Sequence, residues 1–169
     1  LLGTYLTPMA ILTDDAEAMR RVRTKIDEVR KEPALAELLS HTRTVDDVLP
    51  ADQEKKVAIL KEIRQILTPK IRKSVPPERK AALDRFTSGD EPKVLRPEDL
   101  PTTFTRGLRE NDGRMDRVVL VFPKTTRALW DGTRVTDLVG NLRETSASAA
   151  APTTVKAPRL AGSLPISAD

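Results

Sequence analysis

Few residues of this chain could carry out chemistry. It has one histidine, His41, and no cysteine. Thiol nucleophiles, thiolate metal sites and disulfides are therefore excluded, and a nucleophilic triad or a multi-histidine metal site would have to be built around His41. His41 lies in a polar, strand-like stretch with no catalytic motif beside it. We therefore expect His41 to have no catalytic role and the protein not to be an enzyme.

Aspartates occur in two adjacent pairs, Asp14-Asp15 and Asp46-Asp47. Such pairs can hold a divalent cation. Each pair stands just before a candidate helix, however, where acidic side chains cap free backbone N–H groups and stabilise the positive end of the helix dipole. Capping is therefore the favoured interpretation. The glycine-rich loops that bind phosphate are missing from the sequence, so we expect no nucleotide, no metal ion and no other cofactor.

Basic side chains are concentrated between residues 51 and 86. This segment has five acidic residues and ten basic ones, which are Lys55, Lys56, Lys61, Arg64, Lys70, Arg72, Lys73, Arg79, Lys80 and Arg85. One interpretation is an electrostatic contact with anionic lipid headgroups or an acidic partner, and the other is the solvated outer face of two amphipathic helices. The charges are spread around both helices, which favours the solvated face.

Aromatic residues make up only 3% of the chain, and its net charge is +4. A nucleic-acid binder needs stacking platforms and a concentrated positive surface, so we expect no nucleic-acid partner. Phe104 and Trp130 are the large aromatic residues that could line a groove or a surface for a ligand or partner. Their helical spacing is more typical of core positions, which is the interpretation we favour for both.

The elements that must position these residues follow from the apolar pattern. It predicts strands at residues 5–12, 41–45, 118–122 and 160–166, with helices at 14–32 and 127–145 between them. Further helices are expected at 52–68, 77–88 and 100–108, the last closed by the turn Asn111-Asp112-Gly113. The continuous apolar run at 118–122 is typical of a central strand covered on both faces.

This order predicts an α+β fold, a ferredoxin-like split βαβ sandwich (βαββαβ) with a helical insertion between its halves. Residues 1–50 form the first half, 51–113 the insertion and 114–169 the second half, all within one domain. Alanine, serine, threonine and proline dominate residues 145–158, which predicts a flexible connector there. The longest apolar run is far shorter than the roughly 20 residues of a membrane span. We therefore expect a soluble domain, and the start at Leu1-Leu2-Gly3 suggests a fragment of a longer protein.

Several motifs together resemble one family. They are Arg96-Pro97-Glu98-Asp99-Leu100-Pro101, Asn111-Asp112-Gly113-Arg114, Val119-Leu120-Val121-Phe122-Pro123-Lys124, and Val48-Leu49-Pro50-Ala51-Asp52-Gln53-Glu54-Lys55. With the helix that contains Trp130 and Leu138, their order is similar to the extracytoplasmic domain of bacterial exporters of the resistance-nodulation-division (RND) superfamily. The resemblance is to the MMPL-type, lipid-exporting branch that includes the hopanoid transporters, and it covers most of residues 9–143.

The resemblance implies a porter-like domain at the periplasmic face of the bacterial inner membrane, held between two transmembrane helices of a proton-driven exporter. Its partners would be a lipid or another hydrophobic small molecule and the other domains of the parent transporter, which could form an oligomer. Proton-coupling residues of this superfamily lie in membrane helices, so the resemblance implies no catalytic, metal or substrate-contact residue here. Two alternatives stay open: a stand-alone periplasmic adaptor or protein-interaction module of the same fold, and a hydrolase centred on His41.

Overall fold

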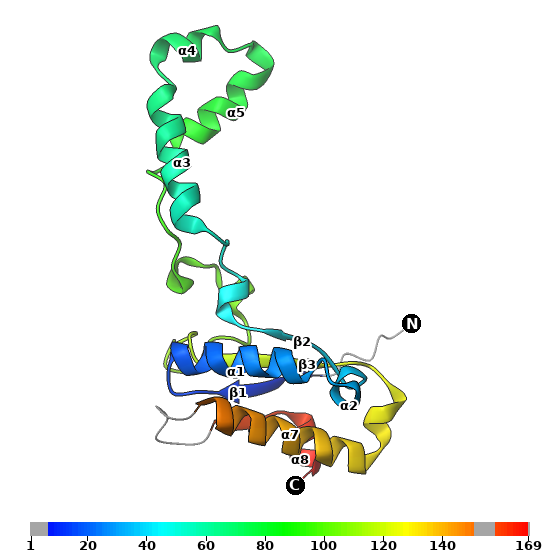
Figure 1. Ribbon diagram of the computed structural model, residues 1–169. Coiled ribbons are helices and arrows are strands. Elements are labelled where there is room, and N and C mark those ends of the chain that lie inside the picture. Colours follow the sequence, from blue (N-terminus) through cyan, green and yellow to red (C-terminus); the bar gives the residue numbers. More distant parts are fainter. Residues whose placement is uncertain (1–6, 151–157, 169) are drawn as a thin grey trace. The chain divides into compact units, whose positions relative to one another are not determined.

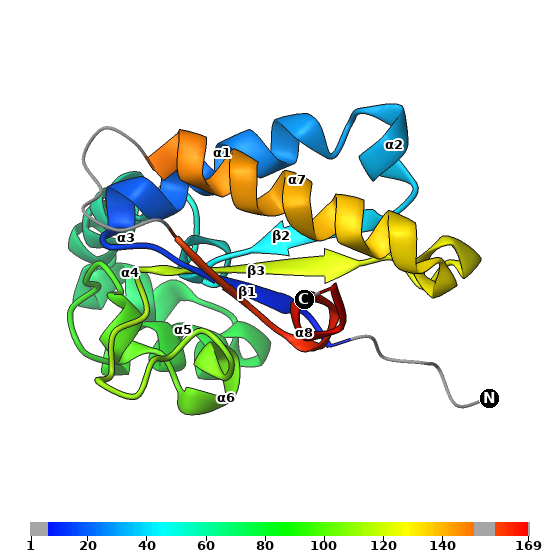
Figure 2. The ribbon, with the colours of Figure 1, turned by 90° about the horizontal axis from the view of Figure 1, so that it is seen from below.

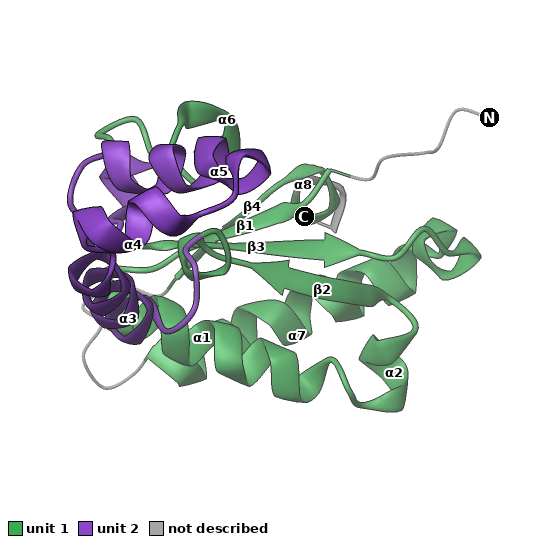
Figure 3. Ribbon diagram, turned by 90° about the horizontal axis from the view of Figure 1, so that it is seen from above, with its two compact units in different colours: residues 1–48, 101–169 green, residues 49–100 purple. Residues whose placement is uncertain are grey.

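The protein has an α+β fold with a four-stranded antiparallel sheet. A computed structural model describes residues 7–150 and 158–168. The chain forms two compact units: unit 1 comprises Leu1–Val48 and Pro101–Asp169, and unit 2 comprises Leu49–Leu100 (Figure 3). Unit 2 is thus a continuous insertion between two parts of unit 1.

The sheet belongs to unit 1. Its strands are β1 (Met9–Leu12), β2 (Leu39–Arg43), β3 (Val118–Pro123) and β4 (Arg159–Ala161). They are ordered β2-β3-β1-β4, and all neighbouring strands are antiparallel. The strand expected at 118–122 is confirmed as a central strand, and its residues are almost all buried. Of the strand expected at 5–12, Met9–Leu12 is confirmed, and residues 5 and 6 lie outside the described residues.

One face of the sheet is covered by α1 (Ala16–Val29) and α7 (Gly132–Ala150), which lie side by side (Figure 2). The core between these helices and the sheet contains fully buried residues of both layers: Met9, Ile11, Met19, Val22, Ile26, Val119, Val121, Leu138 and Leu142. The helix spacing of Met19, Val22 and Ile26 produces this apolar stripe. The alternation of Met9 with Ile11 and of Val119 with Val121 places the strand side chains on the helix-covered face.

The helix α7 is longer than its composition predicts. Residues 145–150, which we expected to begin a flexible connector, form its last turns, and residues 151–157 lie outside the described residues. Ser146 is buried, and its hydroxyl donates to the carbonyl oxygen of Leu142 at 2.6 Å. The Arg21 guanidinium donates to the carbonyl oxygens of Ala149 and Ala150 at 3.2 and 3.4 Å. A cation from α1 thus satisfies the free carbonyls at the C-terminus of α7. This contact cannot be predicted from the local sequence, because Arg21 lies far from α7 along the chain.

Short helices complete unit 1: α2 (Pro33–Ala36), α6 (Thr102–Thr105), α8 (Ser163–Ala168) and the 3₁₀ turns at Val45–Asp47 and Arg127–Trp130. The helix expected over residues 100–108 is confined to α6. The strand expected at 160–166 ends at Ala161, because Gly162 turns the chain with φ +146°. A Cβ atom at Gly162 would lie 3.2 Å from the Met9 Cα, so this close approach of two backbones requires glycine.

Unit 2 consists of α3 (Gln53–Ile66), α4 (Pro69–Ser74), α5 (Pro77–Ser88) and a 3₁₀ turn at Pro97–Asp99 (Figure 1). Every residue of unit 2 is described, and none in these three helices is buried. Polar contacts hold the unit together instead. The Leu95 backbone N–H donates to the Gln53 side chain at 2.7 Å, and the Arg64 guanidinium donates to the carbonyl oxygens of Phe86 and Gly89 at 3.0 and 3.3 Å.

Replacing Gly140 by alanine should stabilise the protein. Gly140 lies within α7, and an added Cβ atom would meet nothing within 4 Å. Alanine restricts the unfolded chain more than glycine does, so the free energy of unfolding should rise by about 0.5–1 kcal/mol in chemical denaturation. Gly113→Ala is the matched control: Gly113 has φ +89°, where alanine is strained, so this variant should be less stable than the wild type. Equal effects of the two substitutions would contradict the helical assignment of residue 140.

Candidate ligand-binding site

The face of the sheet opposite α1 and α7 is also apolar. Ala10 and Leu12 of β1 alternate with the core residues Met9 and Ile11. Their neighbours on this second face are the β3 residues Val118, Leu120 and Phe122, and Leu108 and Val48 pack against the same cluster. Leu108 covers Val118 and Leu120, whereas Ala10 and Leu12 remain half-buried. A sheet that faced water would carry polar residues at these positions, so this face needs a cover or a ligand.

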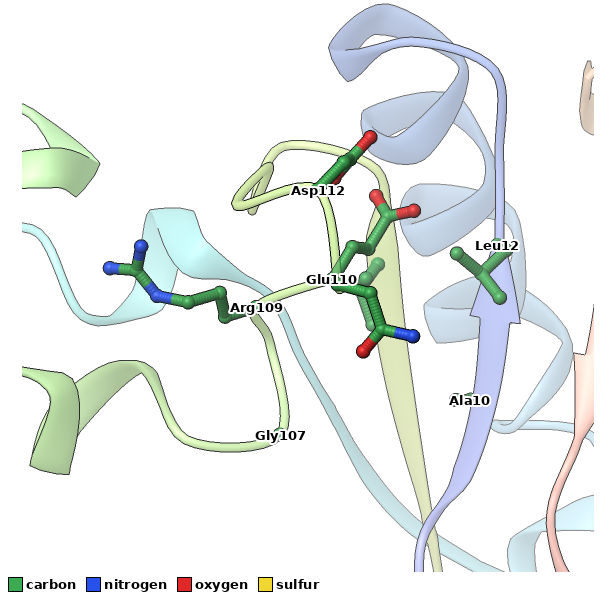
Figure 4. A pocket seen from close by; sticks show the side chains of 8 residues that line it. Ala10, Leu12, Gly107, Arg109, Glu110 and Asp112 are labelled. Carbon is green, nitrogen blue, oxygen red and sulfur yellow. The ribbon is translucent and has the colours of Figure 1, made fainter.

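A pocket of about 480 Å³ lies on this second face of the sheet. Ala10, Leu12 and Val118 form its floor, and the loop that precedes β3 forms its wall (Figure 4). The loop lines the pocket with Gly107, Arg109, Glu110, Asn111 and Asp112. This volume is within the range that holds a small molecule.

The expected turn at Asn111-Asp112-Gly113 shapes this wall. The Gly113 N–H donates to the Glu110 carbonyl oxygen at 3.0 Å, and the Glu110 N–H donates to the Arg114 carbonyl oxygen at 2.8 Å. The Asp112 carboxylate accepts from the Arg114 N–H at 3.0 Å, as an aspartate at a turn commonly does. Gly113 supplies the positive φ that closes the turn.

Arg117 fixes the acidic side chains of the wall. Its guanidinium donates to both carboxylate oxygens of Glu110, at 2.9 and 2.8 Å, and to the Asp112 carboxylate at 3.0 Å. The side chains of Arg117 and Glu110 are 21% and 16% exposed, so the pair is partly shielded from solvent. The hydrogen bonds that Arg117 donates to Glu110 raise the pKa of Arg117 above its ordinary value. Arg109, by contrast, points away from β1 (Figure 4).

Two further cations lie at the edges of the same sheet face. Arg43 of β2 pairs with Leu120, and Arg159 of β4 pairs with Leu12. Residues directly opposite in an antiparallel pair share a face, so both arginines belong to the face that carries the pocket. Both are exposed. The arrangement is an apolar floor with charged surroundings, which suits a molecule with an apolar body and a polar or anionic end.

His41 lies outside this pocket, on β2. Its ring stacks on Phe122 with the centroids 4.4 Å apart and the planes 5° apart. Its Nδ1 atom is 3.1 Å from the Ser40 hydroxyl. Among the hydrogen bonds of the described residues, none joins a carboxylate to His41, so the Ser40–His41 pair has no third group to orient it. The pair alone does not form a catalytic triad.

The two aspartate pairs act as caps and ion-pair partners. The Asp15 carboxylate accepts from the Ala18 N–H at 2.7 Å and caps α1. Asp47 accepts from the Thr44 N–H at 2.8 Å, and Arg23 donates to it from α1. Asp46 accepts from Arg20 at 3.0 Å, and this hydrogen bond raises the pKa of Arg20. The favoured capping interpretation is thus confirmed for Asp15. Asp47 does not precede a helix but lies inside the 3₁₀ turn Val45–Asp47, where it closes a capping box with Thr44, and Asp46 connects this turn to α1.

Residues 7–150 and 158–168 contain no group of three or more His, Cys, Asp or Glu side chains close enough to hold a metal ion. In the same residues, no helix combines the length and the apolar character needed to cross a bilayer.

The expectation that Phe104 and Trp130 are core residues is wrong. Trp130 is 87% exposed and Phe104 is 57% exposed. Trp130 lies in the 3₁₀ turn before α7, where Ala128 and Leu129 make the contacts with the core instead. Their spacing resembles that of a helix, but each residue lies in a helical segment of only four residues, α6 for Phe104 and the 3₁₀ turn Arg127–Trp130 for Trp130, where the side chain can point to solvent.

The wall residues Arg109 and Glu110 were not singled out from the sequence, and Asn111 was predicted only as part of a turn. The sequence does contain a signal for the pocket floor. Ala10 and Leu12 alternate with Met9 and Ile11 along β1, and Val118 and Leu120 alternate with Val119 and Val121 along β3. Both strands therefore have apolar side chains on both faces. A two-layer fold covers only one of these faces with helices, and the other must find another cover. No protein-family model, no curated protein and no solved structure matches this chain.

Proposed function

We propose that unit 1 is a ferredoxin-like sandwich that binds or passes an amphiphile, as the periplasmic domain of an RND-type exporter of lipids or other amphiphiles. The strand order β2-β3-β1-β4, with α1 and α7 on one face and a helical unit inserted between β2 and β3, supports the fold. The observation that carries the function is the pocket, in which an apolar floor meets a charged wall. The sequence resemblance to lipid exporters supports the same class of cargo.

The energetics of a lipid tail favour such a floor. Each methylene that leaves water contributes about 0.8 kcal/mol, and the half-buried Leu12 and Ala10 offer an apolar surface for it. The polar end of the amphiphile would then lie against the loop at Arg109–Asp112 or near the arginines at the sheet edges. A conduit domain needs this combination, because it has to shield a tail while the headgroup remains hydrated.

Replacing Leu12 by glutamine should weaken the binding of an amphiphile. We expect delipidated protein, titrated with a fluorescent fatty-acid analogue below its micelle concentration, to saturate at micromolar protein. Leu12→Gln replaces floor surface by a polar group and should raise the Kd by roughly five- to thirtyfold. Leu160→Gln is the matched control: Leu160 is also half-buried, but it pairs with Ile11 on the opposite face of the sheet. Failure of the wild type to saturate, or equal Kd values for both variants, would contradict the proposal.

A stand-alone adaptor or protein-interaction module is the second candidate, and one observation favours it. Trp130 is 87% exposed, and tryptophan is enriched among the residues that dominate protein interfaces. The gene sequence on either side of the 169 residues distinguishes an exporter domain from a stand-alone adaptor. An exporter domain requires apolar helical segments on both sides, whereas an adaptor requires an upstream signal peptide without membrane helices.

A further inference from the structure

We propose that unit 2 docks on an anionic lipid bilayer through a basic, isoleucine-bearing surface at the turn between α3 and α5. This surface, called the basic tip below, comprises residues 63–75: the last turn of α3, all of α4 and their connection. It is separate from the pocket of unit 1, and the inference does not depend on the function proposed for that pocket.

The charge of the protein is concentrated in this part of the chain. Residues 51–86 have ten basic and five acidic residues, while the remainder has 19 and 20, so the net charge of +4 comes from this segment. Within it, no acidic residue occurs between Glu62 and Glu78, and four basic ones do. Arg64 is occupied by the carbonyl oxygens of Phe86 and Gly89. Lys70, Arg72 and Lys73 remain, all exposed and all on α4.

These three cations have no acidic partner in unit 2. The ion pairs of this fully described unit are Lys55–Asp52, Lys61–Glu91 and Lys93–Asp99. Within this unit, the one side-chain hydrogen bond of the three cations runs from Arg72 to the Leu67 carbonyl oxygen at 3.1 Å. Three unneutralised cations on one six-residue helix attract an anionic surface, and each contributes about 1 kcal/mol when it lies near anionic lipid.

Isoleucine side chains lie beside these cations. Ile66 is 58% exposed and Ile71 is 40% exposed, and Ile59 and Ile63 extend the apolar stripe along α3 at 55% and 40%. Positions 59, 63 and 66 share one helix face, which differs from the face at Val57, Leu60 and Arg64 that points into unit 2. A simple solvated face has no need of four exposed isoleucines. Cations next to an apolar stripe are typical of a helix that lies in the bilayer interface.

The composition favours a lipid surface over an acidic protein. Protein interfaces are enriched in aromatic residues and arginine and depleted in lysine. The basic tip has two lysines and two arginines, of which Arg64 is already bound to the carbonyl oxygens of Phe86 and Gly89, and it has no aromatic residue. The aromatic residue of unit 2, Phe86, lies outside the basic tip and is half-buried, with the Arg64 guanidinium 5.7 Å from its ring centre. A bilayer requires only charge and apolar side chains, and the tip offers both.

Cosedimentation of the 169-residue chain with lipid vesicles tests this proposal. We expect binding to vesicles of phosphatidylcholine and phosphatidylglycerol in equal parts, weak binding to phosphatidylcholine alone, and release at high ionic strength. The double variant Lys70→Glu and Lys73→Glu should bind roughly 30-fold less tightly or worse. Lys25→Glu with Lys31→Glu, two exposed lysines of unit 1, changes the net charge equally and should bind nearly as well as the wild type. Circular dichroism should show that both variants keep the wild-type helix content.

Substitution of the isoleucines distinguishes binding to a membrane from binding to an acidic polymer. Ile66→Asn with Ile71→Asn should weaken vesicle binding severalfold without changing the charge, because the apolar contribution to interfacial binding is lost. Equal binding by this variant, together with equally tight binding of the wild type to polyglutamate, would show an electrostatic protein-binding surface and overturn the proposal. So would indifference to phosphatidylglycerol, or equal losses in the two lysine double variants.

Discussion

Leu138→Ala is expected to lower the free energy of unfolding by about 2–5 kcal/mol, the cost of a large-to-small substitution in a packed core. Leu138 has no exposed surface and lies where α7 meets α1 and the sheet. The substitution removes the transfer free energy of three carbon atoms and leaves a cavity between two rigid layers. This would be a large part of the stability of a typical domain, 5–15 kcal/mol. Urea denaturation followed by circular dichroism measures the effect.

Ile63→Ala is the control for this prediction. Ile63 is also an apolar helix residue, but it is 40% exposed and belongs to unit 2. Its truncation should change the free energy of unfolding by less than about 0.5 kcal/mol, as is usual for surface positions. If Leu138→Ala were as mild as Ile63→Ala, the packing of α7 against the sheet would be contradicted.

Glu110→Ala is expected to lower the free energy of unfolding by about 1–3 kcal/mol. It removes both acceptors that Glu110 presents to Arg117, and Arg117 then keeps only the hydrogen bond to Asp112. Leaving a partly shielded guanidinium without its main partner lowers the free energy of unfolding more than the loss of an exposed ion pair does. Because Glu110 also begins the turn that forms the pocket wall, the same variant should weaken amphiphile binding.

Arg114→Ala is the matched control for Glu110→Ala. The Arg114 side chain is 61% exposed and lies 3.7 Å from the Asp112 carboxylate, so it forms a largely exposed ion pair in the same loop. Such pairs contribute about 0–1 kcal/mol, and the variant should unfold almost as the wild type does. Comparable losses in the two variants would indicate that the loop is held by its backbone turn rather than by the Glu110–Arg117 pair.

Much of unit 1 could be predicted from local sequence. The spacing of Met19, Val22 and Ile26 identified α1, and Asp15 at its start is the cap that the structure contains. The apolar run at 118–122 identified β3 as a central strand, and Asn111-Asp112-Gly113 identified the turn. These features depend on interactions within a few residues, namely helix periodicity, capping and the backbone freedom of glycine. Their physical cause is therefore present in the sequence itself.

Other features depend on segments that are distant in the sequence. The end of α7 is set by Arg21, which lies 128 residues before Ala149. The pocket floor arises because β1 and β3 pair with Ala10 opposite Leu120 and Leu12 opposite Val118. The exposure of Trp130 follows from the way in which Leu129, and not the tryptophan, turns toward the core. Local sequence patterns do not predict these three features, because each depends on a residue that only the tertiary fold brings near.

The sequence by itself determined the helix α1 and the central strand β3, the absence of thiol chemistry, and the concentration of cations between residues 51 and 86. Only the tertiary structure decided which apolar residues remain uncovered: Ala10 and Leu12 on the second sheet face, and Ile66 and Ile71 beside the cations of α4. The physical reason is that hydrophobicity belongs to a residue, whereas burial belongs to a packing arrangement. An apolar side chain becomes a candidate contact only when the fold gives it no neighbour.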